Sequence, residues 1–234
     1  MPFSPDQVIS YLEMCAEEQS SLQRGMNFRI GPSHSVILMS VRVGAPYDDQ
    51  VSDDGQTLVY EGHNAPRNSE TPVPQVVDQP LTTDKGTLTQ NGRFYAAAEA
   101  YRNEEQEPDH VRVYEKIRTG IWVYSGLFLL IDAWSEESGS RSVFKFKLEL
   151  SPNQHEGPSP KGQKPTKSPG RMIPQAIKIK VWKRDGGRCT KCGAKDDLHF
   201  DHIIPFSKGG SSLTDQNVQL LCAHHNLEKS AQIT

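Results

Sequence analysis

The chain has 234 residues, of which 35% are hydrophobic and 24% are charged, which is enough for one large domain or two modest ones. No apolar run approaches the roughly 18 residues that a membrane span needs. The N-terminus, MPFSPDQVISYLEMCAEEQ, carries acids where a signal peptide would be basic and then apolar. The sequence therefore predicts a soluble, cytoplasmic protein with no membrane partner.

Charge is divided unevenly along the chain, although the net charge is only −3. Residues 1–150 contain 13 Lys and Arg against 22 Asp and Glu, a net charge of −9, whereas residues 151–234 contain 13 against 7, a net charge of +6. Local positive charge is what neutralises phosphates, so the C-terminal third is the part that favours nucleic-acid binding.

The N-terminal part begins with a helical pattern and continues with β patterns. A Ser-Pro start and apolar residues at helical spacing predict an amphipathic helix over residues 5–22. The segment NGRFYAAAEAYRNE predicts a second helix over residues 91–104. Segments rich in β-branched and aromatic residues predict five strands, over residues 35–43, 56–62, 111–117, 121–134 and 142–150.

Residues 151–171, SPNQHEGPSPKGQKPTKSPGR, are rich in Pro, Ser, Gly and Lys and contain no aliphatic side chain. This composition predicts an extended, flexible linker. The chain would then consist of a domain over residues 1–150, the linker over 151–171 and a second domain over 172–234. A flexible linker implies that the two domains act at a variable distance from each other.

The second domain contains two metal-ligand knuckles, Cys189-x-x-Cys192 and Cys222-x-x-His225. In a chain without secretory signals, metal ligation is favoured over disulfides. Zinc takes four such ligands, and a module of roughly 50 residues needs this stabilisation. The sequence predicts a structural zinc site, in which His224 remains an alternative to His225.

Between the knuckles lie a strand-like segment containing Asp201-His202, the loop FSKGGSS, a second strand preceded by Asn217, and a helix carrying HHN-x-x-K. This order of residues resembles the HNH endonuclease family over about residues 176–232. The resemblance implies a zinc-stabilised ββα-metal fold and a second, catalytic metal.

The chemistry of phosphodiester hydrolysis explains these residue types. A histidine with a pKa near neutrality can take the proton from the attacking water, and a divalent cation offsets the charge that develops on the phosphate. Mg²⁺ or Mn²⁺ prefers hard oxygen ligands. The expected roles are His202 as general base, Asp201 and Asn226 as ligands of the catalytic cation, and Lys229 as a phosphate contact. The resemblance to the HNH family implies that Asn217 orients the general base. His224 is also an alternative to Asn226.

The N-terminal part carries the short motifs GAPYDD at 44–49, YEG at 60–62 and DQPLT at 78–82. Together with the strand pair at 111–117 and 121–134, these motifs resemble the SET- and RING-associated (SRA) domain family over about residues 24–150. The resemblance implies a crescent-like β-barrel that flips a modified cytosine out of duplex DNA.

A flipped base loses its stacking and its pairing, so its pocket must supply aromatic faces and polar partners. We expect Tyr47 and Tyr60 to be the two aromatic faces. A carboxylate can accept from the exocyclic amine of cytosine, and Asp49 is expected in this role, with Asp48 as an alternative. Tyr60 may instead be a core residue of its strand, and this alternative stays open.

The sequence as a whole predicts an α+β protein in which an SRA-like β-barrel with flanking helices is joined to a zinc-stabilised ββα-metal (HNH) domain. The expected function is a modification-dependent, type IV-like DNA endonuclease that flips 5-methylcytosine or 5-hydroxymethylcytosine and cuts double-stranded DNA nearby. A single nuclease domain cuts one strand, so a homodimer is expected. Two alternatives are a modified-DNA-binding protein with an inactive, structural HNH module, and an HNH nuclease whose N-terminal domain reads unmodified DNA.

Overall fold

The structure is a computed structural model that describes residues 3–31, 33–40, 47–52, 55–69, 71–154, 172–205 and 208–231. Gly44–Pro46 of the first motif and residues 155–171 of the predicted linker lie outside these ranges. The described residues form a mixed α+β fold, as the sequence predicts. None of their helices has the length and apolar character that a bilayer crossing requires.

One large sheet contains every strand longer than a single bridge in the described part of the chain. The strands are β1 (Gln7–Ser10), β2 (Met26–Asn27), β3 (Ser35–Met39), β4 (Gln50–Val51), β5 (Thr57–Glu61), β6 (His110–Arg118), β7 (Ile121–Ser138), β8 (Arg141–Leu150), β9 (Leu198–His202) and β10 (Val218–Cys222). The five strands predicted for the N-terminal part correspond to β3, β5, β6, β7 and β8.

Four helices lie around this sheet in the described part of the chain. They are α1 (Tyr11–Glu17), α2 (Gln90–Arg102), α3 (Gln175–Asp185) and α4 (Ala223–Ala231), with short 3-10 turns η1 (Pro74–Val76) and η3 (Asp215–Asn217). Helix α2 begins at the N-cap Thr89, whose side chain accepts from the N–H of Gly92. A side-chain cap of this kind satisfies one of the backbone donors that a helix start leaves free.

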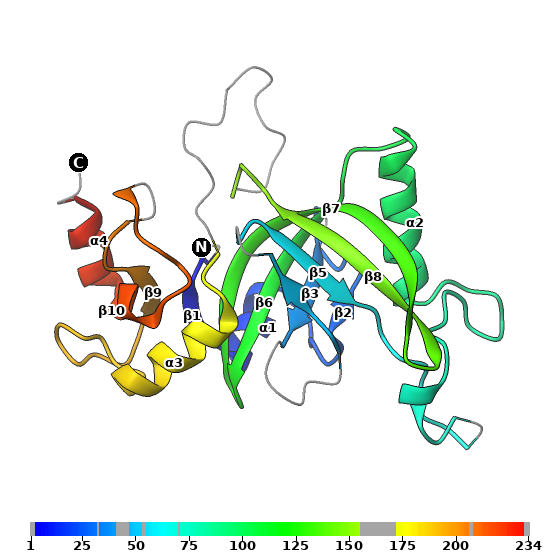
Figure 1. Cartoon of the computed structure of the whole chain (residues 1–234), viewed down its shortest axis with the longest axis horizontal. Coiled ribbons are helices and arrows are strands. Elements are labelled where there is room, and N and C mark those ends of the chain that lie inside the picture. The colour runs from blue at the N-terminus through cyan, green and yellow to red at the C-terminus, as the bar shows by residue number, and fades with distance from the viewer. Residues whose placement is uncertain are drawn as a thin grey trace.

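Strand β7 belongs to two parts of the sheet. Its first half pairs with β1 on one side and β6 on the other, and its second half pairs with β8. A register shift between Leu130 and Asp132 and a positive φ of 119° at Gly126 interrupt its regular pairing. Irregularities of this kind bend a strand, and β7 and β8 form the arch that dominates Figure 1. The sheet therefore curves around the N-terminal core.

That core is built from both parts of the curved sheet and from one face of α2. Its buried side chains come from β2, β3, β5, β6, β7, β8 and α2, together with Met172 from the segment before α3. Phe94 on α2 packs edge-on against Phe146 on β8, with ring centroids 5.9 Å apart. This packing matches the SRA-like, sheet-rich domain that the sequence predicts.

The predicted helix over residues 5–22 is wrong at both ends. Residues Gln7–Ser10 form β1, and the helix α1 runs only from Tyr11 to Glu17. Ser10 is the reason for the late start, because its side chain accepts from the N–H of Glu13 while the Glu13 carboxylate accepts from the N–H of Ser10. This capping box fixes the helix start. Within α1, Met14 is buried and Leu12 is exposed.

The C-terminal part has the predicted order of strand, loop, strand and helix. Strands β9 and β10 are antiparallel, with Asp201 opposite Gln219 and His202 opposite Val218. Helix α4 follows β10 directly. Helix α3, which precedes β9 in the chain, packs against β10. In Figure 1 these elements lie to the left of the curved sheet.

Strand β1 connects the two parts of the molecule. It pairs with β7 over four residues and with β9 through Gln7 and His199, and in Figure 1 it lies between the left-hand module and the curved sheet. The order of the main sheet path is therefore β10-β9-β1-β7-β6-β3-β2. A sheet that is continuous through β1 joins the C-terminal module to the N-terminal domain.

Candidate functional site

Four potential metal ligands meet where β10 runs into α4. Cys189 Sγ lies 3.5 Å from His225 Nδ1, Cys222 Sγ lies 3.3 Å from the same nitrogen, and the sulfurs of Cys192 and Cys222 are 3.8 Å apart. All four donor atoms lie within 4.8 Å of one another. The turn that presents the first two thiols is closed by a hydrogen bond from the N–H of Gly193 to the carbonyl of Cys189, 2.8 Å long.

These distances fit a tetrahedral zinc ion. Zinc bonds of about 2.3 Å to sulfur and about 2.0 Å to nitrogen require S–S edges of about 3.8 Å and S–N edges of about 3.5 Å. Burial opposes charge on the Cys189 thiol, but backbone N–H groups of the two knuckles lower its pKa to about 6, and the thiolate is the form that binds metal. His224 is exposed and lies outside this four-membered group. The geometry therefore favours His225 as the fourth ligand.

The residues expected to cut DNA lie at the end of β9. Asp201 and His202 are half-buried, and His202 Nε2 lies 2.8 Å from the Ser212 hydroxyl. Burial lowers the pKa of His202, although the carboxylates of Asp6 and Asp201 oppose this shift. The imidazole is therefore neutral at neutral pH, which is the form that can accept a proton.

Asn217 holds the loop that approaches His202. Its side-chain oxygen accepts from the N–H of Ile204 at 2.8 Å, and its amide nitrogen donates to the carbonyls of Ile204 and Ser211, both at 3.0 Å. Ser211 precedes Ser212, the hydrogen-bond partner of His202. Asn217 thus holds the loop that carries Ser212, the hydrogen-bond partner of His202.

Gly210 allows the loop to pack closely. A Cβ added there would lie 1.8 Å from the carbonyl oxygen of Ile204 and 2.7 Å from the amide nitrogen of Asn217. Contacts this short with backbone are impossible for any other residue, so the glycine of the motif FSKGGSS is required by the approach of the loop to Asn217.

Lys229 and Asn226 lie on α4, one turn apart. The ammonium group of Lys229 contacts the carboxylate of Asp201 and the carbonyl oxygen of His202. Lys229, the predicted phosphate contact, therefore lies against Asp201, the predicted cation ligand. Asn226 is half-buried on the same helix.

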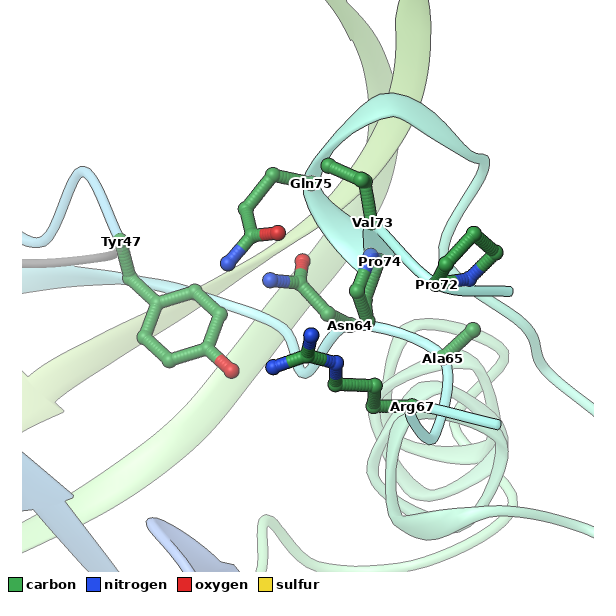
Figure 2. Close-up of a pocket in the computed structure, with 8 residues that line it drawn as sticks. All are labelled: Tyr47, Asn64, Ala65, Arg67, Pro72, Val73, Pro74 and Gln75. Atoms are coloured by element: carbon green, nitrogen blue, oxygen red, sulfur yellow. The ribbon is translucent and has the colours of Figure 1, made fainter. Parts of the chain in front are cut away.

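The N-terminal domain has a polar pocket beside Tyr47. The pocket has a volume of about 490 Å³ and is lined by Tyr47, Asn64, Ala65, Arg67, Pro72, Val73, Pro74 and Gln75. Figure 2 shows the Tyr47 ring facing the polar ends of Asn64, Arg67 and Gln75. Tyr47 is half-buried, so one side of its ring can contact a ligand.

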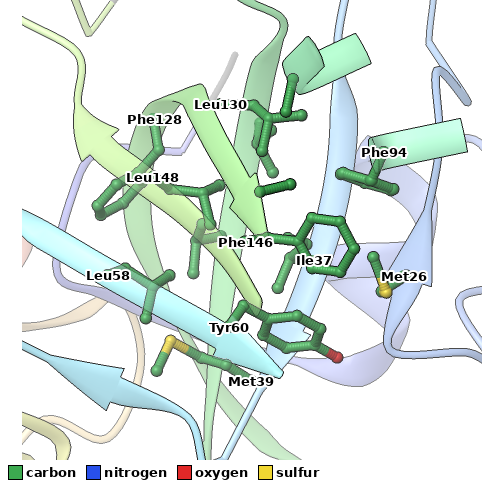
Figure 3. Packing of buried hydrophobic residues seen from close by; sticks show 14 of the residues in the cluster. Met26, Ile37, Met39, Leu58, Tyr60, Phe94, Phe128, Leu130, Phe146 and Leu148 are labelled. Carbon is green, nitrogen blue, oxygen red and sulfur yellow. The ribbon is translucent and has the colours of Figure 1, made fainter. Parts of the chain in front are cut away.

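Tyr60 has a different environment from Tyr47. It is only 1% exposed, and Figure 3 shows its ring among the core side chains, next to Met39. The two tyrosines meet at His63, which stacks on Tyr47 with ring centroids 5.7 Å apart and lies 6.4 Å from the Tyr60 ring. The Tyr60 hydroxyl is 3.3 Å from His63 Nε2. In this conformation a histidine ring, not an open slot, adjoins both tyrosines.

His63 is neutral and its backbone is held firmly. Burial lowers its pKa to about 4, and Arg24 adds to the shift. The Asn91 side chain accepts from the N–H of His63 and donates to its carbonyl, both at 2.8 Å. These two bonds fix the backbone of His63 beside Tyr47.

The two candidate acids differ in burial. Asp49 is buried, and its carboxylate accepts from the N–H groups of Glu61 at 3.1 Å and Ser40 at 3.3 Å. Burial raises the pKa of Asp49 to about 7 despite these hydrogen bonds. The Asp48 side chain is 68% exposed and accepts from the Gln50 amide at 2.7 Å. The structure gives Asp49 a role in joining β3 to β5 and leaves Asp48 open to solvent.

A buried charged network behind this pocket was missed by the sequence analysis. Glu61 lies 3.1 Å from both Arg141 and Lys145, and all three side chains are nearly inaccessible. Lys145 also donates to the carbonyl of Asp48 at 3.1 Å. The sequence of β8 alone does not reveal the partner of Lys145, because Glu61 comes opposite it only through the pairing of β5 with β8.

Two of the three short motifs of the N-terminal part, YEG and DQPLT, meet at Gly62. The Gln79 amide donates to the carbonyl of Gly62 at 2.6 Å, and a Cβ on Gly62 would lie 2.7 Å from Gln79 and 2.8 Å from Asn91. The motifs YEG and DQPLT therefore form one hydrogen-bonded unit. His63, which follows this unit directly, could have been noticed as an aromatic ring next to it.

Comparison with known proteins agrees with both parts of the structure. The family described as the SAD/SRA domain matches residues 13–154, and the family described as HNH endonuclease matches residues 189–232. No curated protein matches the chain.

Several solved structures are similar. The SUVH5 SRA domain in complex with hemi-methylated CG DNA is 26% identical, with 68% of this chain and 91% of that chain covered and a TM-score of 0.43. The SUVH5 SRA domain bound to fully hydroxymethylated CG DNA is 23% identical, with 68% and 91% covered and a TM-score of 0.44. Arabidopsis thaliana SUVH6 in complex with SAM is 20% identical, with 86% and 32% covered and a TM-score of 0.44.

The match to the first family covers more than half of the chain, and the second covers the module that holds the metal-ligand cluster. The chain therefore belongs to the SAD/SRA domain family and carries an HNH endonuclease domain at its C-terminal end.

Proposed function

We propose that this protein is a modification-dependent DNA endonuclease. The observation that carries the proposal is the presence, in one chain, of an SAD/SRA domain with a pocket beside Tyr47 and an HNH domain with a neutral His202 beside Asp201. The substrate is double-stranded DNA that contains 5-methylcytosine or 5-hydroxymethylcytosine. The biological role would be a type IV-like restriction function in the cytoplasm.

Base capture is assigned to Tyr47, Tyr60 and an acid. The flipped base would stack on Tyr47, and base stacking on an aromatic side chain contributes about 1–3 kcal/mol. Because His63 lies against both tyrosines, its ring must swing aside when the base inserts. Asp49 would accept from the exocyclic amine, with the exposed Asp48 as the alternative acid.

Hydrolysis is assigned to the end of β9 and to α4. A catalytic Mg²⁺ or Mn²⁺, held by Asp201 and Asn226, would offset the charge that develops on phosphate and on the leaving 3′ oxygen. With Nε2 of His202 close to Ser212, its Nδ1 would take the proton from the attacking water. Asn217 keeps the loop in place, and Lys229 would move from Asp201 to the phosphate when the cation binds.

The chain carries one HNH domain, and this number bears on the oligomeric state that double-strand cleavage needs. One HNH domain cuts one strand, so a double-strand break requires two copies of the chain or two successive nicks. We propose a homodimer on DNA, because two SRA domains can each read one modified base and direct one cut.

A second candidate function is favoured by one observation. Lys229 neutralises Asp201 in the structure, as expected for a module that binds no catalytic cation. The protein would then be a modified-DNA-binding protein with a structural HNH module.

The test is a cleavage assay with Mg²⁺ or Mn²⁺ on matched duplexes that differ only at cytosine C5. Wild-type protein should cut the modified duplex, and His202→Ala should reduce the rate by on the order of 10²–10⁴-fold. Tyr47→Ala should abolish the preference for modified DNA while its nuclease site stays intact. Equal, slow cutting by wild type and His202→Ala would favour the second candidate instead.

A further inference from the structure

The C-terminal module shares a hydrophobic core with the N-terminal domain. Ile117 on β6 and Val123 on β7 belong to the same buried cluster as Ile177 and Val181 on α3 and Phe200 on β9. Each of these side chains is less than a tenth exposed. A core of this kind lies inside one folded unit, whereas independent domains joined by a tether each close their own core.

Backbone hydrogen bonds tie the same two parts together. The N–H of Phe200 donates to the carbonyl of Asp6 at 3.0 Å, next to the bridge between Gln7 and His199. The Gln175 side chain at the start of α3 donates to the carbonyl of Lys116 on β6 at 2.9 Å. These bonds fix the position of β9 relative to β1 and of α3 relative to β6.

A buried ion cluster fixes the docking further. Lys178 on α3 is 0% exposed, and its ammonium lies 2.9 Å from the carboxylates of both Asp6 and Glu115. Asp6 immediately precedes β1, and Glu115 lies on β6. The ammonium of Lys178 therefore joins α3 of the C-terminal module to two segments of the N-terminal domain. A shift of α3 by one residue would leave a buried ammonium unpaired, which is strongly destabilising. The cluster therefore admits one docking position.

We propose that the Lys178 cluster holds the nuclease centre at a fixed offset from the base pocket, so that cleavage falls at one defined distance from the modified cytosine. Asp6, Glu115 and Lys178 are positioning residues, because they lie at the junction and not at either site. This inference rests on the proposed function and replaces the variable distance that the linker composition implies.

Free tethering and fixed docking predict different spreads of cleavage positions, and the spread can be measured. A tether of 17 residues over 155–171 can span at most about 60 Å, which corresponds to about 18 base-pair steps at about 3.4 Å each. Free tethering would therefore scatter cuts over more than a helical turn of DNA. Docking through Lys178 predicts a single peak in the distribution of ends.

The experiment maps both strands of a long duplex that contains one modified cytosine, at single-nucleotide resolution. Wild type and a variant with ~10 Gly and Ser residues inserted within 155–171 should give the same narrow peak. Lys178→Met should broaden or shift the peak, while Lys180→Met, the same change on the exposed side of α3, should leave it unchanged. Scattered wild-type ends, or a peak that moves with the insertion, would overturn the proposal.

A second measurement does not depend on cutting or on the folding of Lys178→Met. A protease site is placed within residues 155–171 of the full chain, and the cleaved protein is passed over a gel-filtration column. Docked halves should elute together, and separate elution of the wild-type halves would overturn the proposal. Co-elution without any modification-dependent DNA ends would instead refute the proposed nuclease function and leave the docking intact.

Discussion

At the scale of single residues, the choice between His224 and His225 determines the fourth ligand of the metal cluster. The arrangement of Cys189, Cys192, Cys222 and His225 fits tetrahedral zinc. We expect His225→Ala to reduce bound zinc well below one equivalent, because three thiolates alone leave one tetrahedral position open.

The matched control for this prediction is the neighbouring residue. His224→Ala should keep one equivalent of zinc, since His224 is exposed and lies outside the cluster. Metal analysis of both purified variants checks the prediction. Loss of zinc from His224→Ala alone would show that the two histidines have the opposite roles.

Asp49 makes stability depend on pH. Burial raises the pKa of its carboxyl to about 7 in the folded protein, whereas an unfolded Asp titrates near about 3.9. Between these values the folded state binds the proton and the unfolded state does not, so the free energy of unfolding falls as pH rises from about 4 to about 7. Asp49→Asn should remove this part of the pH dependence.

Thermal unfolding between about pH 4 and 7 tests this prediction through the difference between variants, because other groups such as His63, whose pKa is lowered to about 4, titrate equally in every protein. Asp48→Asn is the control, since the Asp48 side chain is exposed. Asp49→Asn should gain stability relative to wild type and Asp48→Asn as pH rises over this range. Parallel curves for all three proteins would contradict the raised pKa.

At the scale of elements, the loop between β9 and β10 is set by Asn217 and Gly210. We expect Gly210→Ala to lower the cleavage rate by at least tenfold, because the added Cβ displaces Asn217 or Ile204 and a small displacement of a catalytic group is costly. Zinc content should stay at one equivalent, since the loop lies away from the thiolates. Full activity of Gly210→Ala would show that the loop does not position His202.

The sequence predicted most element types in both parts of the chain, but it missed β1 and the two-residue strands β2 and β4. Alternation and β-branched residues identified β6, β7 and β8, because each strand has its own local signal. Residues Gln7–Ser10 have no such signal, and they form a strand because β7 and β9 offer partners on both sides. Only tertiary context decides such a segment.

The sequence predicted the local motifs of the candidate sites but not the contacts between distant residues, and the reason is physical. Each knuckle spans four residues and Asp201-His202 are adjacent, so each is a local signal in the sequence, and the HNH family match confirms the resemblance. The SRA motifs are likewise confirmed by the family match. His63 beside Tyr47, Lys145 beside Glu61 and Lys178 beside Glu115 depend on strand pairing and helix docking, which the sequence does not encode locally.

At the scale of the whole molecule, the shared core predicts coupled unfolding. Cys189 and Cys222 belong to the same buried cluster as Ile117 and Val123 of the N-terminal domain. Removal of zinc with a chelator should therefore lower the melting temperature of the entire protein, because binding that stabilises one part stabilises every part that unfolds with it. A chelator-sensitive transition separate from an unchanged one would contradict this coupling.

Calorimetry together with far-ultraviolet circular dichroism checks the coupling. The heat-capacity peak and the loss of sheet signal should coincide, as for a cooperative transition. The same comparison for Lys178→Met should split the transition into two, since this change weakens the docking of α3 on β6.

The place of β1 in the sheet has a consequence for biosynthesis. Residues 7–10 leave the ribosome long before residues 121–124 and residue 199, with which they pair. One edge of β1 can pair as soon as β7 has been made, whereas the other edge stays open until β9 follows. A nascent or truncated chain lacks β9 at this edge, so the sheet is completed only when the C-terminal module has been synthesised.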